Sequence, residues 1–166
     1  MTIQEIAEVV KGFSPLIIST VALFITWRYN LKNRELANDK MMKEIFLESN
    51  NRYDRLNDFI NLILSIKTEE EVMNFYDSNS DTEINGITKS LLLYKINDYF
   101  NLCAEEYYWK KKGRIDDTIW YSWEVGMNRI YNESKIIQSM WMVECKNEGF
   151  KSYYIDKPNA FFKNAK

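Results

Sequence analysis

The sequence contains no histidine among its 166 residues, which removes the most common general base in enzymes and a frequent metal ligand. Without histidine, neither a Ser-His nor a Cys-His nucleophile pair can form, and histidine-based zinc sites are excluded. Cys103 and Cys145 are too few for a structural zinc site, and we expect both to be reduced thiols. We therefore expect a protein that is not an enzyme and that binds neither a metal nor a cofactor.

Glycine and proline are also scarce, with five and two residues, which argues against strands and tight turns and favours long helices. The 46% hydrophobic and 15% aromatic content is enough to form a core, and the length leaves room for one soluble domain beside a membrane segment. The formal net charge of −2 excludes a strongly basic nucleic-acid binder, although it leaves local basic patches open.

Residues 12–27, GFSPLIISTVALFITW, contain no charged side chain. As a helix they extend about 24 Å, slightly less than the roughly 30 Å of a bilayer core. Val9 and Val10 lengthen the apolar run on one side, and Trp27 suits the aromatic belt at the membrane interface. We predict a transmembrane helix. The alternative is a buried helix of a soluble core, because the run is shorter than the usual span of about eighteen residues.

Basic residues lie mainly on the C-terminal side of this segment, as they do on the cytoplasmic side of membrane helices. That side carries Arg28, Lys32, Arg34, Lys40 and Lys43, whereas the N-terminal side carries Lys11 and the terminal amine. We therefore expect a single-pass protein with its N-terminus outside and its C-terminal domain in the cytoplasm. A cleavable signal peptide fits poorly, because acidic residues occupy the place of its basic region and no small-residue cleavage site follows.

Small or hydroxyl-bearing residues recur in this segment at spacings of three and four, which places them on one face of a helix. This small-residue stripe consists of Gly12, Pro15, Ser19, Ala22 and Thr26. Such residues gather where membrane helices pack together or line water, so the stripe favours a homo-oligomer. In that oligomer the stripe faces either a neighbouring helix or a lumen. The alternative is that the hydroxyls bond to carbonyls of their own helix and the stripe has no partner.

The pattern predicts an all-α fold with three parts. A transmembrane helix with an amphipathic N-terminal extension occupies residues 1–30, a long connecting helix residues 31–66, and a cytoplasmic helical domain with an aromatic-rich tail residues 67–166. The first helix should persist to about Ser65, because neither glycine nor proline occurs between Leu16 and Asn85. The alternative is a break at Asn50-Asn51.

Local signals divide the last part. Thr68 and Glu71 form a capping box for a short helix, and residues 77–86 form a polar loop. Thr88 begins a helix that Gly113 ends, and one of its faces combines Leu92, Ile96, Tyr99 and Cys103 with Glu106 or Tyr107. Asp116 caps the next helix, and a final helix, ESKIIQSMWMVECKNE, is closed by Gly149. We expect the tail after it to dock on the domain or on a neighbouring subunit.

A basic cluster follows two tyrosines and a tryptophan, and it consists of Lys110, Lys111, Lys112 and Arg114. Lysines in the last turn of a helix interact favourably with the helix dipole, so a solvated helix end accounts for the cluster. The alternatives are contact with RNA, through phosphates and stacking, or with anionic lipid or a protein partner.

Arg129 invites comparison with the HEPN family of small helical ribonucleases, in which a histidine follows an arginine by four to six residues. Here no histidine follows, so at best the chain resembles a HEPN bundle with a vestigial site. Arg129 is then expected to form a capping or interface salt bridge.

Residues 91–142 carry an Asn-Asp-Tyr-Phe helix, a Lys-Gly-Arg-Ile-Asp junction at Lys112–Asp116 and an aromatic-rich helix after it. In these features the chain resembles small bacterial proteins with one N-terminal transmembrane helix and a cytoplasmic HEPN-like domain. Its size and topology are similar to those of the membrane accessory proteins of type VI-B CRISPR loci. The resemblance implies a homo-oligomeric ring in the bacterial inner membrane that opens during phage infection and depolarises the membrane, beside an RNA-guided nuclease.

Three hypotheses follow. The first is a self-assembling pore of antiviral defence, with the small-residue stripe near or lining a central passage. The second is a membrane-tethered adaptor that recruits a nuclease or its RNA without forming a pore. The third, a divergent ribonuclease, would need Arg129 and a carboxylate to replace the missing histidine.

Overall fold

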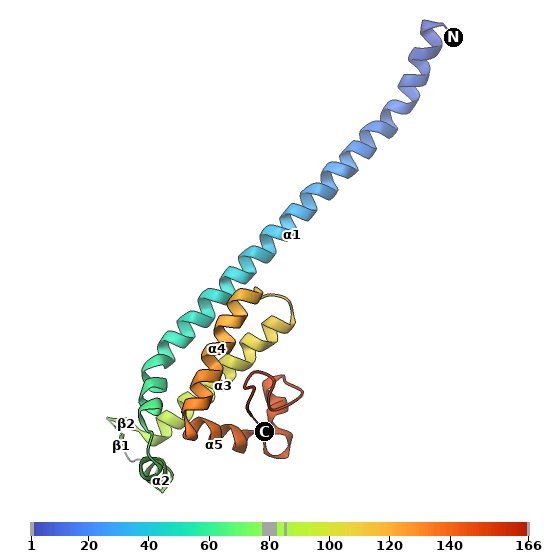
Figure 1. Ribbon diagram of the computed structural model, residues 1–166. Helices are drawn as coiled ribbons and strands as arrows, with labels where there is room; N and C mark the ends of the chain where they lie inside the picture. Colours follow the sequence, from blue (N-terminus) through green and yellow to red (C-terminus); the bar gives the residue numbers. More distant parts are fainter. Residues whose placement is uncertain (1, 78–82, 85, 166) are drawn as a thin grey trace. The chain divides into compact units, whose positions relative to one another are not determined.

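The computed structural model describes residues 2–77, 83–84 and 86–165 (Figure 1). The fold is all-α, as the scarcity of glycine and proline predicts, apart from one short hairpin. The chain forms two compact units, Met1–Met41 and Met42–Lys166. The second unit begins earlier than the boundary at residue 67 expected from the sequence, so the C-terminal part of the first helix belongs to this unit.

Helix α1 covers Ile3–Ser65, a length of 63 residues, and continues without a break through Pro15 and Asn50. The prediction of one uninterrupted helix to Ser65 is confirmed. In the second unit this helix buries one face, at Ser49, Leu56, Ile60 and Ile63. These positions repeat at intervals of three to seven residues, which keeps them on the same side of an α-helix.

The second helix, α2, covers Glu69–Asp77 and starts with the predicted capping box. The Thr68 hydroxyl accepts a hydrogen bond from the Glu71 amide at 3.1 Å, and the Glu71 carboxylate accepts one from the Thr68 amide at 3.0 Å. Strands β1 (Glu83–Ile84) and β2 (Ile87–Thr88) then pair antiparallel, the first within the loop predicted at residues 77–86 and the second directly after it. The other loop positions, 78–82 and 85, lie outside the described residues.

Helix α3 (Lys89–Lys111) begins and ends where the sequence signals it, and α4 (Asp117–Glu133) begins directly after the predicted cap. The Thr88 hydroxyl accepts a hydrogen bond from the Leu91 amide at 3.4 Å, and the Asp116 carboxylate accepts one from the Thr118 amide at 2.8 Å. Gly113 has a φ of 66°, the left-handed conformation that ends α3 at no steric cost.

The last helix differs from the prediction. Helix α5 covers Lys135–Glu144 and is followed by a 3₁₀ segment, η1, over Lys146–Tyr153. The expected helix to Gly149 is wrong, because Asn147 and Glu148 adopt positive φ values of 51° and 64°. Gly149 is needed for close approach instead, since an added Cβ would lie 2.1 Å from the Glu144 carbonyl oxygen.

The tail docks on the helical domain, as expected, and supplies much of its core. Phe161 and Phe162 are fully buried, and Phe162 packs on Trp141 with ring centroids 5.2 Å apart. Asn128 of α4 fixes the tail, because its amide donates to the Phe161 carbonyl at 2.9 Å and its oxygen accepts from the Lys163 amide at 2.7 Å. The tail is thus an integral layer of the second unit.

Candidate functional site

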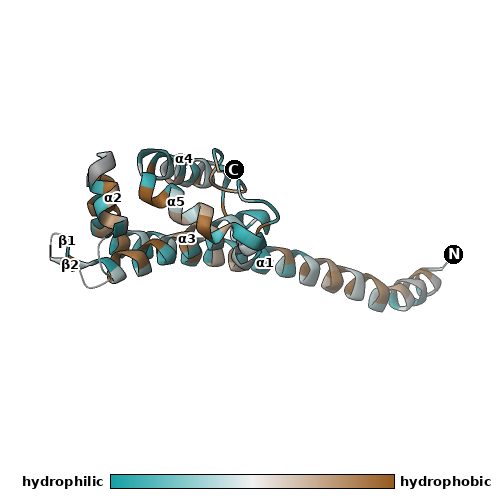
Figure 2. Cartoon of the chain, turned by 90° about the horizontal axis from the view of Figure 1, so that it is seen from below, coloured by the Kyte–Doolittle hydropathy of each residue, from teal (hydrophilic) through white to brown (hydrophobic). Residues whose placement is uncertain are grey.

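The N-terminal part of α1 has the length and composition of a membrane-crossing helix. An 18-residue window within Ile6–Ser65 has a mean hydropathy of 1.8, and none of that window is buried. Figure 2 shows hydrophobic residues recurring along this part of the helix. Phe13, Ile17 and Phe24 are each more than half exposed, and such a continuous apolar surface is ordinarily covered by lipid or protein.

All five residues of the small-residue stripe lie on this one continuous helix. The Ser19 hydroxyl donates to the Pro15 carbonyl at 2.8 Å and lies 3.0 Å from the Leu16 carbonyl. The Thr20 hydroxyl, outside the stripe, donates to the Leu16 carbonyl at 2.8 Å. A hydroxyl bonded back to its own helix tolerates hydrocarbon, so Ser19 needs neither water nor a partner to be satisfied. Gly12 has open space around the position of a Cβ, which leaves room for a neighbour.

The basic cluster at the end of α3 is largely paired. Lys110 forms an ion pair with Asp117, and the Lys111 ammonium lies 3.2 Å from the Asp156 carboxylate. The Lys112 ammonium lies over the Tyr108 ring, 5.4 Å from its centroid, and Arg114 is half-buried. The cluster therefore offers less free positive charge to RNA or lipid than its sequence indicates.

Arg129 lies on the surface of α4 and faces Glu133 one turn later, at 3.6 Å. Both side chains are about half exposed, so the pair contributes little to stability. This surface ion pair fits the expectation of a salt bridge, and the carboxylate that it places beside Arg129 is that of Glu133.

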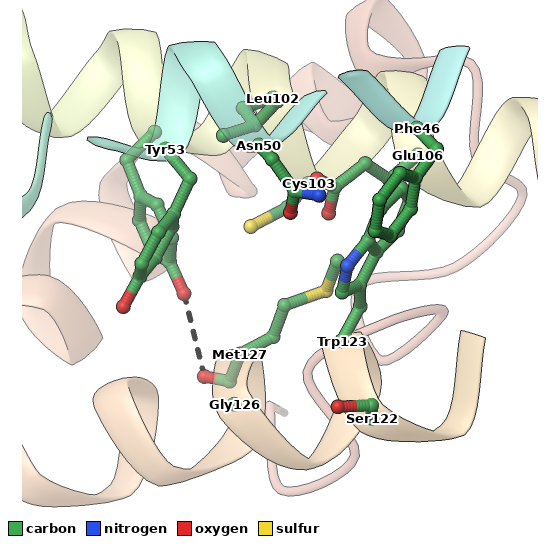
Figure 3. A pocket seen from close by; sticks show the side chains of 11 residues that line it. Phe46, Asn50, Tyr53, Leu102, Cys103, Glu106, Ser122, Trp123, Gly126 and Met127 are labelled. Atoms are coloured by element: carbon green, nitrogen blue, oxygen red, sulfur yellow. Dashed lines mark hydrogen bonds between the residues drawn. The ribbon is translucent and has the colours of Figure 1, made fainter. Parts of the chain in front are cut away.

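A cavity of about 400 Å³ lies within the second unit, between α1, α3 and α4 (Figure 3). Helix α1 supplies Phe46, Asn50 and Tyr53, and the Phe46 ring stacks on Trp123 of α4 with centroids 6.0 Å apart and an interplanar angle of 7°. Glu106 of α3 also lines the cavity and is 6% exposed. Aromatic walls with a few polar groups are typical of small-molecule sites.

The electrostatics of the cavity centre on Glu106. Burial raises the pKa of its carboxyl to about 8, and the charge of Glu105 adds to this, while Arg52 acts in the opposite direction. Burial also raises the pKa values of Cys103 and Tyr99, so both stay protonated near neutral pH. The Tyr99 hydroxyl donates to the Met127 carbonyl at 3.5 Å (Figure 3). The cavity is therefore lined by uncharged groups at neutral pH.

The sequence did not single out this cavity, although one signal was present. Glu106 falls on the apolar face of the helix that begins after Thr88, where a carboxyl is out of place. The partners of that face come from α1 and α4, which lie distant in the sequence, so the periodicity alone cannot reveal this cavity.

Within the described ranges, no group of three or more cysteine and carboxylate side chains is arranged to hold a metal ion. Comparisons with protein-family models, curated proteins and solved structures find no match to this chain. The exposed apolar segment of α1 and the cavity are therefore the features of the described chain that bear on function.

Proposed function

We propose that this chain is a membrane-anchored accessory protein of antiviral defence that self-assembles into an oligomeric pore in the bacterial inner membrane. One observation carries the proposal: residues 12–27 form an uncharged, exposed helix within a segment of sufficient hydropathy to cross a bilayer. The resemblance of residues 91–142 to accessory proteins of type VI-B CRISPR loci supplies the biological setting.

Self-assembly is supported by the small-residue stripe. Membrane helices have no hydrophobic driving force for association, so close backbone approach at small residues contributes much of the attraction. Gly12 has open space around it, and Ser19 and Thr26 present small hydroxyl side chains on the same face. In a ring of many copies these residues lie near or line the passage, where hydroxyls keep it wettable.

The proposed orientation places the N-terminus outside and residues 42–166 in the cytoplasm, because basic residues follow the span. In this position the second unit can meet an RNA-guided nuclease or its RNA, which are the proposed partners besides the bilayer and further copies of the chain. The pairing of Lys110 with Asp117 and of Lys111 with Asp156 favours a protein partner over RNA at the basic cluster.

The proposal is tested by expressing the full chain in bacterial cells and measuring three properties. We expect it in the alkali-resistant membrane fraction, as a species much larger than a 19.9 kDa monomer after detergent extraction, and with increased uptake of a membrane-impermeant dye. A monomer in detergent that causes no dye uptake would contradict the pore, and a freely soluble chain would contradict membrane anchoring altogether.

The second candidate is a membrane-tethered adaptor without pore activity, and the Ser19 hydroxyl favours it. Because this hydroxyl bonds to carbonyls of its own helix, the stripe needs no lumen water. Replacing residues 12–27 with an unrelated apolar helix of the same length separates the two functions. An adaptor keeps its activity after the exchange, whereas a pore loses it.

A further inference from the structure

The cavity between α1, α3 and α4 contains a carboxyl group without a protein partner. Among the described residues, nothing hydrogen-bonds or forms an ion pair with the side chain of Glu106, and only charges at a distance act on it. Arg52, the arginine whose charge acts on Glu106, is hydrogen-bonded to the neighbouring carboxylate of Glu105. Glu106 is mostly removed from water and lines the cavity, so its carboxyl is available to a polar or charged ligand that enters there.

The walls around this carboxyl indicate the chemistry of the missing partner. Phe46 and Trp123 stack on one another, Tyr53 adds a third ring, and Figure 3 shows all three around the space that Glu106 faces. Aromatic rings together with a carboxylate are a combination that binds ammonium groups. None of the residues lining the cavity is a lysine or an arginine, so no cation of the lining itself occupies the space.

We propose that this cavity binds a small organic ammonium ion, with the Glu106 carboxylate as counter-ion and the Phe46, Tyr53 and Trp123 rings around the cation. The volume of about 400 Å³ suits a metabolite-sized ligand. Met127 and Leu102 supply apolar contacts for a carbon chain, and Asn50 supplies one amide for a hydroxyl group. This site is independent of the pore, because every lining residue belongs to Met42–Lys166.

Binding must displace a proton. Burial holds the Glu106 carboxyl protonated at neutral pH, and the ammonium ion replaces that proton, which passes to the buffer. The charges of Arg52 from α1 and Glu105 from α3 act on this carboxyl. The titratable residues that line the cavity with it are Tyr53 from α1 and Tyr99 and Cys103 from α3, while α4 contributes uncharged residues. Affinity for the cation should therefore fall about tenfold for each pH unit below the Glu106 pKa.

The test uses the full chain in detergent and three ammonium probes, which are tetramethylammonium, choline and phenethylammonium. Isothermal titration at pH 8 should detect at least one probe, and its neutral carbon analogue, such as 3,3-dimethyl-1-butanol for choline, should bind at least about tenfold more weakly. Titration at pH 7 in buffers of different ionisation enthalpy should show the release of close to one proton per ligand bound.

Two variants of equal side-chain size complete the test. Glu106→Gln should weaken binding about tenfold or more and abolish proton release. Glu48→Gln removes one carboxylate from the exposed part of α1, outside the cavity lining, and should leave the affinity unchanged. The proposal is overturned if no probe binds up to about 10 mM, if the neutral analogue binds as well as the cation, or if Glu106→Gln binds like the wild type. A cavity that is only a packing defect would bind none of the three probes.

Discussion

The Arg52 guanidinium on α1 donates a hydrogen bond to the Glu105 carboxylate on α3, whereas Glu106, the next residue, faces a cavity with no ion pair among the described residues. Two adjacent carboxyls thus have opposite environments. Glu105 is half-exposed and paired, and Glu106 is buried and held protonated by its surroundings. This contrast makes the stability of the second unit depend on pH.

Glu106→Gln should stabilise the protein at neutral pH. In the unfolded chain the carboxyl ionises near its ordinary value of 4.5, whereas in the folded protein it keeps its proton up to about pH 8. Folding therefore takes up a proton between these values, and the free energy of unfolding falls as pH rises through this window. The linkage amounts to about 3 kcal/mol at pH 7. Glutamine keeps the size of the side chain and cannot ionise, so the variant does not lose stability as the pH rises.

The measurement is urea unfolding of the detergent-solubilised chain at pH 4.5, 6 and 8, followed by tryptophan fluorescence. The wild type and Glu106→Gln should be similar at pH 4.5 and diverge above it. Glu48→Gln, which changes an exposed carboxylate, should follow the wild type throughout. Parallel pH profiles for the wild type and Glu106→Gln would show that this carboxyl ionises normally in the folded state.

The two glycines of the C-terminal helices should respond in opposite directions to alanine. At Gly149 the new Cβ meets the Glu144 carbonyl oxygen at 2.1 Å, so the backbone must shift, at a cost of about 2 kcal/mol. At Gly126, within α4, nothing lies within 4 Å of the new Cβ, and alanine should stabilise the helix by up to about 1 kcal/mol. Unfolding midpoints in urea measure both changes. Equal effects at the two sites would contradict the close approach at Gly149.

The tail should contribute substantially to the stability of the second unit. Phe162→Ala removes a fully buried ring that packs on Trp141 and Tyr131, and it should cost about 3–5 kcal/mol. Lys157→Ala, an exposed change in the same tail, should alter stability by less than about 0.5 kcal/mol. Near-ultraviolet circular dichroism reports the tertiary packing of the two variants, and urea unfolding measures their stability. A small effect at Phe162 would mean that the helices hold together without the tail.

The features that the sequence predicts are those set by neighbouring residues. Thr88 and Asp116 cap their helices as expected, because a cap is made by a side chain and an amide two or three residues away. The end of α5 could not be predicted, since the turn at Asn147 and Glu148 uses positive φ without glycine. The adjoining 3₁₀ segment is held by Tyr153, whose hydroxyl donates to the Glu144 carboxylate at 3.1 Å.

The candidate sites also differ in whether they depend on neighbouring residues or on residues distant in the sequence. The apolar segment and its stripe are visible in the sequence, because they depend only on helical periodicity and on the absence of charge. The cavity requires Phe46, Glu106 and Trp123 to meet from three helices, and no local pattern specifies that meeting. Likewise, the sequence shows the lysines of the basic cluster but not Asp156, which lies far along the chain and pairs with Lys111.

The small-residue stripe gives the most direct test of the pore. Ser19→Leu with Thr26→Leu fills the stripe with bulk, and dye uptake by cells expressing the chain should fall about tenfold, because copies pack less closely and the passage becomes apolar. The change should not unfold α1, since the Ser19 hydroxyl bonds to carbonyls that belong to its own helix.

The control is Ile17→Leu with Val21→Leu, which changes the shape of two side chains on the opposite, apolar side of the same helix and adds a single methylene group. Both double variants should reach the membrane fraction in equal amounts. A difference in dye uptake then results from the side of the helix that was changed and not from the expression level. Uptake that stays at the wild-type level in the Ser19/Thr26 variant would remove the stripe from the mechanism and favour the tethered adaptor. A loss in both variants would show that packing around the whole circumference of the helix matters, as in a bundle without a lumen.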